Sequence, residues 1–134
     1  MKLAKISRRE IAPSIWCEYY ECKDKSIEML VLFLLNAIET DWSYEMFTQW
    51  LKGKEHQDYN RVSGEVYGLV ERDGRVYVYD EFAPEEEHYN YFNTTKKNMF
   101  NIINDWIRTM YRKPRPNTII VTEENEEVKF TIQD

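Results

Sequence analysis

The chain has 134 residues, which suits one domain and is too short for two substantial ones. Its composition, 43% hydrophobic and 31% charged, is that of a globular protein and argues against disorder, collagen or a membrane protein. The 24 acidic residues outnumber the 18 basic ones, and the formal charge of -6 disfavours a general nucleic-acid binder because like charges repel. We therefore expect a single globular domain over residues 1–134 that binds neither nucleic acid nor membrane directly.

The first ten residues are not followed by the apolar segment of a secretory signal. Cys17 and Cys22 lie in Ser14–Cys22, whose aromatic content predicts a strand. In a strand their Cα atoms are roughly 16 Å apart and their side chains point to opposite faces, so they cannot form a disulfide with each other. Two unpaired thiols are typical of a cytoplasmic protein, and we expect that location.

The first helix is predicted to begin at Ile27, with Ser26 as its cap and Met29–Ile38 as its body. The run Met29–Leu35 is apolar throughout, which indicates burial on every side. The same run also fits a central strand. Its leucine, methionine and alanine content favours the helix.

A second helix is predicted after Trp42, with Ser43 as its cap. Trp42 precedes the cap and Phe47 follows it by four positions, which is the spacing of a hydrophobic staple. Gly53 is expected to end this helix.

Alternation with a period of two runs through residues 62–82, and Asp73-Gly74 supplies the two-residue turn of a hairpin. This register sets Gly68 opposite Tyr79, where the missing side chain is expected to leave room for the ring. Both faces of the hairpin are apolar or aromatic. We therefore expect helices on one face and a partner on the other.

Apolar residues recur at helical spacing over Thr95–Tyr111 and predict an amphipathic helix, which Pro114 and Pro116 terminate. Thr118–Ile132 alternates on both sides of an acidic turn, Glu123–Glu127, and predicts a second hairpin. The predicted fold class is therefore α+β. It comprises an antiparallel sheet, built from two hairpins and an N-terminal strand, packed against about three helices.

Catalytic signatures are weak. Glu85 and His88 have the Glu-x-x-His spacing of carboxylate-bridged metal sites, which require the motif twice, whereas it occurs here once. Pro84 followed by three glutamates is explained more simply as the first turn of a helix. His56 and Asp58 fall in a polar connection and are expected to be solvated. We expect no catalytic residue, no bound metal and no cofactor.

The strongest functional signal is an acidic, aromatic stretch around residues 77–92, in which residues 80–88 include five acids and no lysine or arginine. Tyrosine offers a large contact area at low entropic cost, and clustered carboxylates accelerate the encounter with a basic partner. The alternative is a solvated acidic loop beside ordinary core tyrosines. The predicted partner-binding residues are Tyr79, Asp80, Glu81, Glu85, Glu86, Glu87, Tyr89 and Tyr91.

In overall build the chain resembles the small acidic immunity proteins of bacterial polymorphic-toxin and contact-dependent-inhibition systems. The resemblance rests on the compact α+β organisation, the Gly64-Glu65-Val66-Tyr67 strand, the Arg72-Asp73-Gly74-Arg75 turn and the acidic stretch after Asp80. It implies tight binding of a cognate protein toxin, often a basic nuclease domain, whose active site the acidic surface covers. Such a protein needs no catalytic residue and no cofactor.

The first functional hypothesis is therefore a binding protein that neutralises a cognate, basic toxin by occluding its active site. A second is a small metal-assisted enzyme that uses Glu85 and His88. A third is a structural or regulatory adaptor that forms a homodimer through the two-faced hairpin at residues 62–82.

Overall fold

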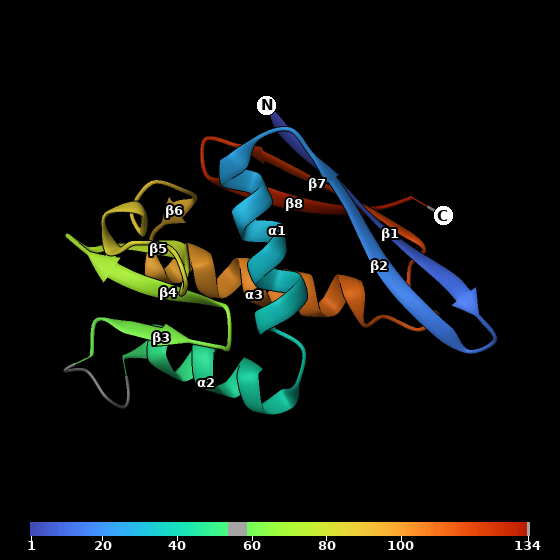
Figure 1. Cartoon of the computed structure of the whole chain (residues 1–134), viewed down its shortest axis with the longest axis horizontal. Coiled ribbons are helices and arrows are strands. Elements are labelled where there is room, and N and C mark those ends of the chain that lie inside the picture. Colours follow the sequence, from blue (N-terminus) through green and yellow to red (C-terminus); the bar gives the residue numbers. More distant parts are fainter. Residues whose placement is uncertain (54–58, 134) are drawn as a thin grey trace.

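The computed structural model describes residues 1–53 and 59–133, and in them it confirms the predicted α+β class. Figure 1 shows helix α1 at the centre, with strands on either side of it. In chain order the elements are β1 (Lys2–Ala12), β2 (Ile15–Cys22), α1 (Lys25–Ala37), α2 (Asp41–Lys52), β3 (Arg61–Ser63), β4 (Tyr67–Arg72), β5 (Arg75–Asp80), the 3-10 turn η1 (Glu85–Glu87), β6 (Asn93–Thr94), α3 (Lys96–Met110), β7 (Thr118–Glu124) and β8 (Glu127–Ile132).

The strands form two antiparallel sheets of four strands each. The terminal sheet has the order β2-β1-β7-β8, and the central sheet has the order β3-β4-β5-β6. The two predicted hairpins, β4–β5 and β7–β8, therefore belong to different sheets. Helix α1 contacts strands of both sheets, and α3 contacts β8 of one and β5 of the other, so these two helices join the sheets (Figure 1).

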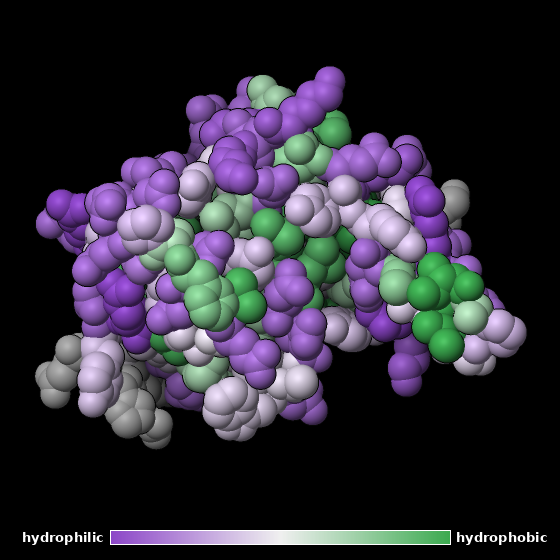
Figure 2. All heavy atoms as spheres, in the orientation of Figure 1, coloured by the Kyte–Doolittle hydropathy of each residue, from purple (hydrophilic) through white to green (hydrophobic). Residues whose placement is uncertain are grey.

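Strand β1 lies before the first strand that the sequence predicts. It pairs with β2 on one side and with β7 on the other, yet only Ala4 and Ile6 of its side chains are buried. Leu3 and Ile11 are 52% and 55% exposed, so the apolar residues of β1 do not alternate as those of a half-buried strand do. Figure 2 shows the consequence, a hydrophobic patch at the tip of the β1–β2 hairpin on the right of the molecule.

Helix α1 begins two residues earlier than expected, because Asp24 rather than Ser26 is its cap. The Asp24 Oδ1 accepts a hydrogen bond of 3.0 Å from the backbone N–H of Ile27. Seven of the thirteen residues of α1 are buried, since the helix lies between the two sheets. This position explains the all-apolar run Met29–Leu35 and confirms the helix against the alternative of a central strand.

Helix α2 is capped by Thr40, and Ser43 is its third residue rather than its cap. The Thr40 hydroxyl accepts from the Ser43 N–H, and the Ser43 hydroxyl accepts from the Thr40 N–H, each at 3.1 Å, which completes a capping box. Trp42 is 72% exposed while Phe47 is buried, so the predicted hydrophobic staple is wrong. Gly53 ends the helix as expected, with a left-handed φ of 65°.

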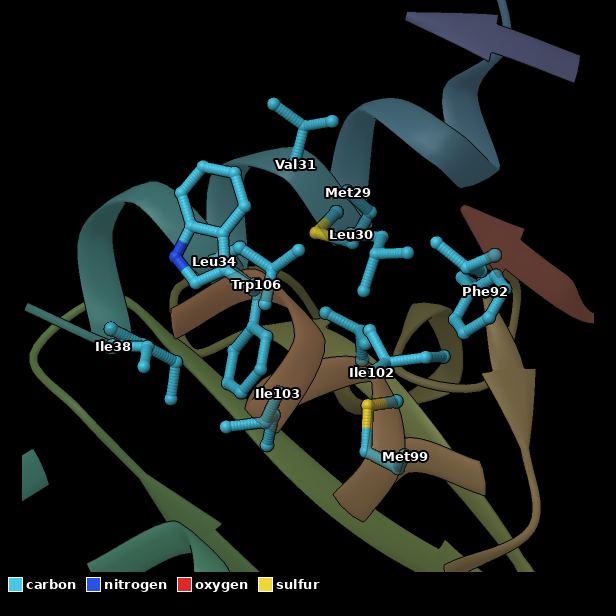
Figure 3. Packing of buried hydrophobic residues seen from close by; sticks show 14 of the residues in the cluster. Met29, Leu30, Val31, Leu34, Ile38, Phe92, Met99, Ile102, Ile103 and Trp106 are labelled. Atoms are coloured by element: carbon cyan, nitrogen blue, oxygen red, sulfur yellow. The ribbon is translucent and has the colours of Figure 1, made fainter. Parts of the chain in front are cut away.

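Helix α3 is the amphipathic helix that the spacing predicts, capped by the Thr95 side chain, which accepts from the Asn98 N–H. Its apolar face packs against α1, and Figure 3 shows the two sets of side chains meeting. The Trp106 ring also lies edge-on to Phe130 of β8, at 5.6 Å between ring centroids. The buried residues of α3 are Met99, Ile102, Ile103, Trp106 and Met110.

The β4–β5 hairpin has the predicted register, with Gly68 opposite Tyr79 and Asp73-Gly74 in the turn. Gly68 is required for a different reason from the one expected. A Cβ atom at Gly68 would lie 2.5 Å from the Val62 carbonyl oxygen and 2.7 Å from the Ser63 Cβ. The space at Gly68 is therefore taken by β3, which pairs with β4, and not by the Tyr79 ring.

The β7–β8 hairpin is also confirmed, and its acidic turn is tied down. Asn125 and Glu126 have positive φ angles of 53° and 70°. The Glu126 carboxylate pairs with Arg75 of the central sheet. The backbone carbonyl of Glu126 accepts a 2.8 Å hydrogen bond from the Asn98 side chain of α3. His56 and Asp58, expected to be solvated, lie outside the described residues.

Candidate protein-binding site

The second face of the central sheet is covered by the chain's own segment 81–92. Val76 and Val78 of β5 face the main core, so Tyr77 and Tyr79 face the opposite way. On that side the Tyr77 ring meets Tyr89 at 5.3 Å and the Tyr79 ring meets His88 at 4.5 Å. On the face where the sequence predicts a partner, Tyr77 and Tyr79 are therefore in contact with the chain's own segment 81–92.

His88 holds this segment on the sheet. It is 5% exposed, its Nε2 lies 2.9 Å from the Ala83 carbonyl oxygen, and its Nδ1 lies 3.3 Å from an Arg61 nitrogen. A guanidinium can only donate, so Nδ1 accepts from Arg61 and the proton sits on Nε2, which donates to Ala83. Both ring nitrogens are thus engaged in hydrogen bonds.

Arg61 connects the sheet, the histidine and the acidic segment. Besides its bond to His88, its guanidinium lies 3.6 Å from the Glu85 carboxylate and 5.1 Å from the centre of the Tyr79 ring. Glu85 therefore faces Arg61, while His88 points at Ala83 and Arg61. The structure does not bring Glu85 and His88 together as a metal pair, and within residues 1–53 and 59–133 no group of three potential ligands is present.

Tyr79, which the sequence analysis places on the binding surface, is fully buried under His88. A residue without exposed surface cannot contact a partner, so Tyr79 is removed from the candidate site. Burial raises the pKa of Tyr79 to about 12, the neighbouring Glu81 carboxylate acts in the same direction, and Arg61 opposes both.

This raised pKa predicts a loss of stability in alkali. The ordinary tyrosine pKa is about 10, so between about pH 10 and 12 the unfolded chain has lost the proton that the folded chain keeps. The free energy of unfolding then falls as the pH rises, by roughly 3 kcal/mol over two pH units. Urea unfolding of Tyr79→Phe over this range is expected to lack this part of the loss. The variant Tyr59→Phe, at a tyrosine that is 65% exposed, is expected to retain it, and equal slopes for the two variants would contradict the assignment.

The acidic loop, defined as residues 80–87, is held by hydrogen bonds of its own. The Asp80 side chain accepts from the Phe82 N–H at 2.9 Å, and the Glu81 N–H donates to the Val66 carbonyl at 2.7 Å. The Glu87 N–H donates to the Pro84 carbonyl at 2.9 Å and closes the 3-10 turn η1. The predicted helix at Pro84 is thus a single turn. The backbone of the loop is fixed before any partner arrives, which lowers the entropic cost of binding.

Phe82 is the exposed ring of this loop, and it is not among the residues predicted from the sequence to bind a partner. It is 78% exposed, between Glu81, which is also exposed, and the outward-facing Glu85 and Glu86. Its position after Asp80 could have identified it, because an Asp that caps a tight turn leaves the next side chains outside. An exposed aromatic side chain among carboxylates combines a hydrophobic anchor with negative charge.

The two remaining predicted tyrosines, Tyr89 and Tyr91, are half-buried and offer little of their surface to a partner. Tyr89 is half-buried between the Tyr77 ring and the Arg72 guanidinium, which lies 4.6 Å from its centre. Tyr91 is half-buried against the core. The exposed part of the predicted site therefore consists of the side chains of Glu81, Glu85 and Glu86, which Phe82 joins, while Asp80 and Glu87 are half-buried.

No family model, curated protein or solved structure matches this chain, so its function has to be argued from its own residues. Among the described residues, no helix is both long enough and apolar enough to cross a membrane.

Proposed function

We propose that this chain is a binding protein that engages a basic protein partner through the acidic loop and neutralises it by covering its active site. The observation that carries the proposal is Phe82, 78% exposed on a hydrogen-bonded turn that also carries five carboxylates. Buried aromatic anchors dominate the energy of protein interfaces. A solvent-exposed phenylalanine held on such a turn is suited to that role.

The charge of the loop supports a cationic partner. Residues 80–87 contain no lysine or arginine. Among the ion pairs of the described residues, only one involves this loop, and it joins Arg61 to Glu85. A concentrated negative surface attracts a positive one over roughly 8 Å at physiological ionic strength and accelerates the encounter. The clefts in which nucleases bind nucleic acid are lined by basic residues, and a basic nuclease domain is the partner that the resemblance to toxin-neutralising proteins implies.

The test begins with the product of the neighbouring open reading frame, purified as the candidate partner. We expect a one-to-one complex whose association rate falls about tenfold when the salt concentration is raised from about 50 to about 500 mM. The partner's activity, and its toxicity on co-expression, are expected to be lost once the chain is equimolar. A complex that forms without loss of partner activity would contradict the occlusion mechanism.

Two variants separate the contributions of charge and of the aromatic anchor. Glu85→Gln/Glu86→Gln is expected to lower the association rate about three- to tenfold. Phe82→Ala is expected to raise the dissociation rate at least tenfold, because the loss of a central anchor costs 2 kcal/mol or more, on the order of the hot-spot threshold. The matched control, Glu39→Gln/Glu124→Gln, removes two exposed charges elsewhere on the molecule. Equal effects of the control and the loop variants would exclude the acidic loop as the contact surface.

A further inference from the structure

The β1–β2 hairpin extends beyond the sheet to which it belongs. Strand β7 pairs with β1 only over Lys2–Ser7, so the rest of the hairpin has no neighbouring strand on that side (Figure 1). This projecting part, residues 8–18, and the adjoining positions 19 and 20 carry a set of large apolar side chains that are 37–55% exposed. The set consists of Ile11, Ile15, Trp16, Tyr19 and Tyr20.

Strand β2 is the edge of the terminal sheet and has an open row of backbone groups. In β1, the Arg8 N–H donates to the Asn117 carbonyl at 2.8 Å, so the backbone groups of Arg8 point away from β2. Glu18 lies opposite Arg8 and therefore directs its own N–H and carbonyl to the outer edge. By alternation, Trp16 and Tyr20 do the same. No backbone hydrogen bond from a residue that the structure describes reaches this edge.

The charges of the edge strand are balanced inside the hairpin. β2 carries two acids, Glu18 and Glu21, and the ladder places Arg8 opposite the first and Lys5 opposite the second. The edge therefore presents backbone groups and aromatic side chains without the excess negative charge of the whole chain. Two copies of this edge therefore do not repel each other electrostatically. A basic partner is not attracted to the edge more strongly than a second copy, because the negative charges of β2 are balanced by β1.

Elementary strand geometry restricts how two copies can pair. In antiparallel pairing, opposite residues share a face and are either both directed toward the partner strand or both directed away from it, so Glu18 can oppose Trp16, Glu18 or Tyr20 of the second copy, but not Tyr19. With Glu18 opposite Trp16, β2 can pair only over residues 15–19, because the strand begins at Ile15. Glu18 opposite Glu18 sets like charges side by side, which is destabilising. The next register sets Tyr19 opposite Tyr19 and each Glu18 opposite a Tyr20. It pairs residues 16–22 of both copies without opposing like charges.

We propose that the chain forms a symmetric homodimer by antiparallel pairing of β2 with β2 of a second copy, centred on Tyr19. The pairing joins the two terminal sheets into one continuous sheet. It is independent of the acidic loop, which lies on the central sheet, so the dimer and the proposed binding function can fail separately.

Cross-linking tests the register directly. In a background of Cys17→Ser and Cys22→Ser, Tyr19→Cys places a thiol opposite its own copy at a non-hydrogen-bonded pair, where the side chains are closest. Mild oxidation is expected to convert most of this variant to a covalent dimer. Glu18→Cys in the same background is expected to cross-link at least tenfold more slowly. Equal rates, or faster cross-linking of Glu18→Cys, would overturn the register.

Proline substitution tests the edge. The Glu18 N–H makes no bond to β1, so Glu18→Pro removes only an outward donor and leaves the hairpin intact. Sedimentation of the wild-type chain is expected to show a concentration-dependent dimer, Glu18→Gln is expected to keep it, and Glu18→Pro is expected to raise the dimer dissociation constant at least tenfold. A wild-type chain that stays monomeric at about 100 μM, a concentration at which even a weak dimer is visible, would overturn the proposal. So would a Glu18→Pro variant that is as dimeric as the wild type.

Discussion

Replacing Trp106 by alanine is expected to lower the free energy of unfolding by about 3–5 kcal/mol. Trp106 is 1% exposed and lies where α3, α1 and the terminal sheet meet, with its ring against Phe130. Its removal leaves a cavity between elements that are held by both sheets and cannot easily close over it. Urea unfolding monitored by far-ultraviolet circular dichroism measures the loss. If the slope of the unfolding free energy against urea concentration is the same in the variant and in the wild type, the loss of stability arises in the native state.

The matched control for this prediction is Trp106→Phe. The indole Nε1 is buried and has no hydrogen-bond partner among the residues described, so its removal relieves a polar group that burial penalises. The smaller ring still fills most of the volume. We expect a loss of less than about 1.5 kcal/mol. A phenylalanine variant as unstable as the alanine variant would show that Nε1 has a partner that matters.

Replacing His88 by alanine is expected to cost about 2–4 kcal/mol, because it removes the hydrogen bonds to the Ala83 carbonyl and to Arg61 and uncovers the Tyr79 ring. The effect should be concentrated in the acidic loop. Hydrogen exchange of the Ala83 and Glu87 amides, which are bonded within the loop, is expected to accelerate at least tenfold more than exchange in α3.

His88→Gln separates the hydrogen bond from the ring. A glutamine amide can still donate to the Ala83 carbonyl, so this variant is expected to recover about half of the lost stability while it lacks the contact with Tyr79. If glutamine and alanine are equally destabilising, the ring contact and not the hydrogen bond holds the loop.

Much of the fold was predictable because local signals agreed with one another. The Asp73-Gly74 turn fixes the register of β4 and β5, since both residues adopt the positive φ angles that such a turn needs. The apolar spacing of α3 identifies a helix with one side against the core. The all-apolar body of α1 identifies a helix with most of its sides against the core. In each case the pattern and the packing require the same residues.

The remainder depended on contacts that are distant in sequence. Strand β1 is held by pairing with β7, more than a hundred positions away, and its own residues are mostly charged or exposed. The predicted caps, Ser26 and Ser43, are two and three residues after the observed caps, Asp24 and Thr40. All four residue types can cap a helix, so only the backbone geometry shows which of them does. The division into two sheets follows from the same long-range pairing.

The candidate site was predictable in its charges and not in its aromatic residues. Sequence alone identifies the five acids of the acidic loop, because exposed carboxylates need no tertiary context. It assigns Tyr79 to the surface and leaves Phe82 out, because both lie in one aromatic stretch. Only the folding of segment 81–92 back onto β5 decides that the first is buried and the second exposed.

The order of the strands also has a consequence for biosynthesis. The central sheet is built from four strands that follow one another along the chain, so it can form while the ribosome is still adding residues. The terminal sheet pairs β1 with β7, a strand more than a hundred positions later, and stays incomplete until β7 has left the exit tunnel. Until then the β1–β2 hairpin has both of its edges free, and the nascent chain is vulnerable to premature association while the residues between β2 and β7 are being added.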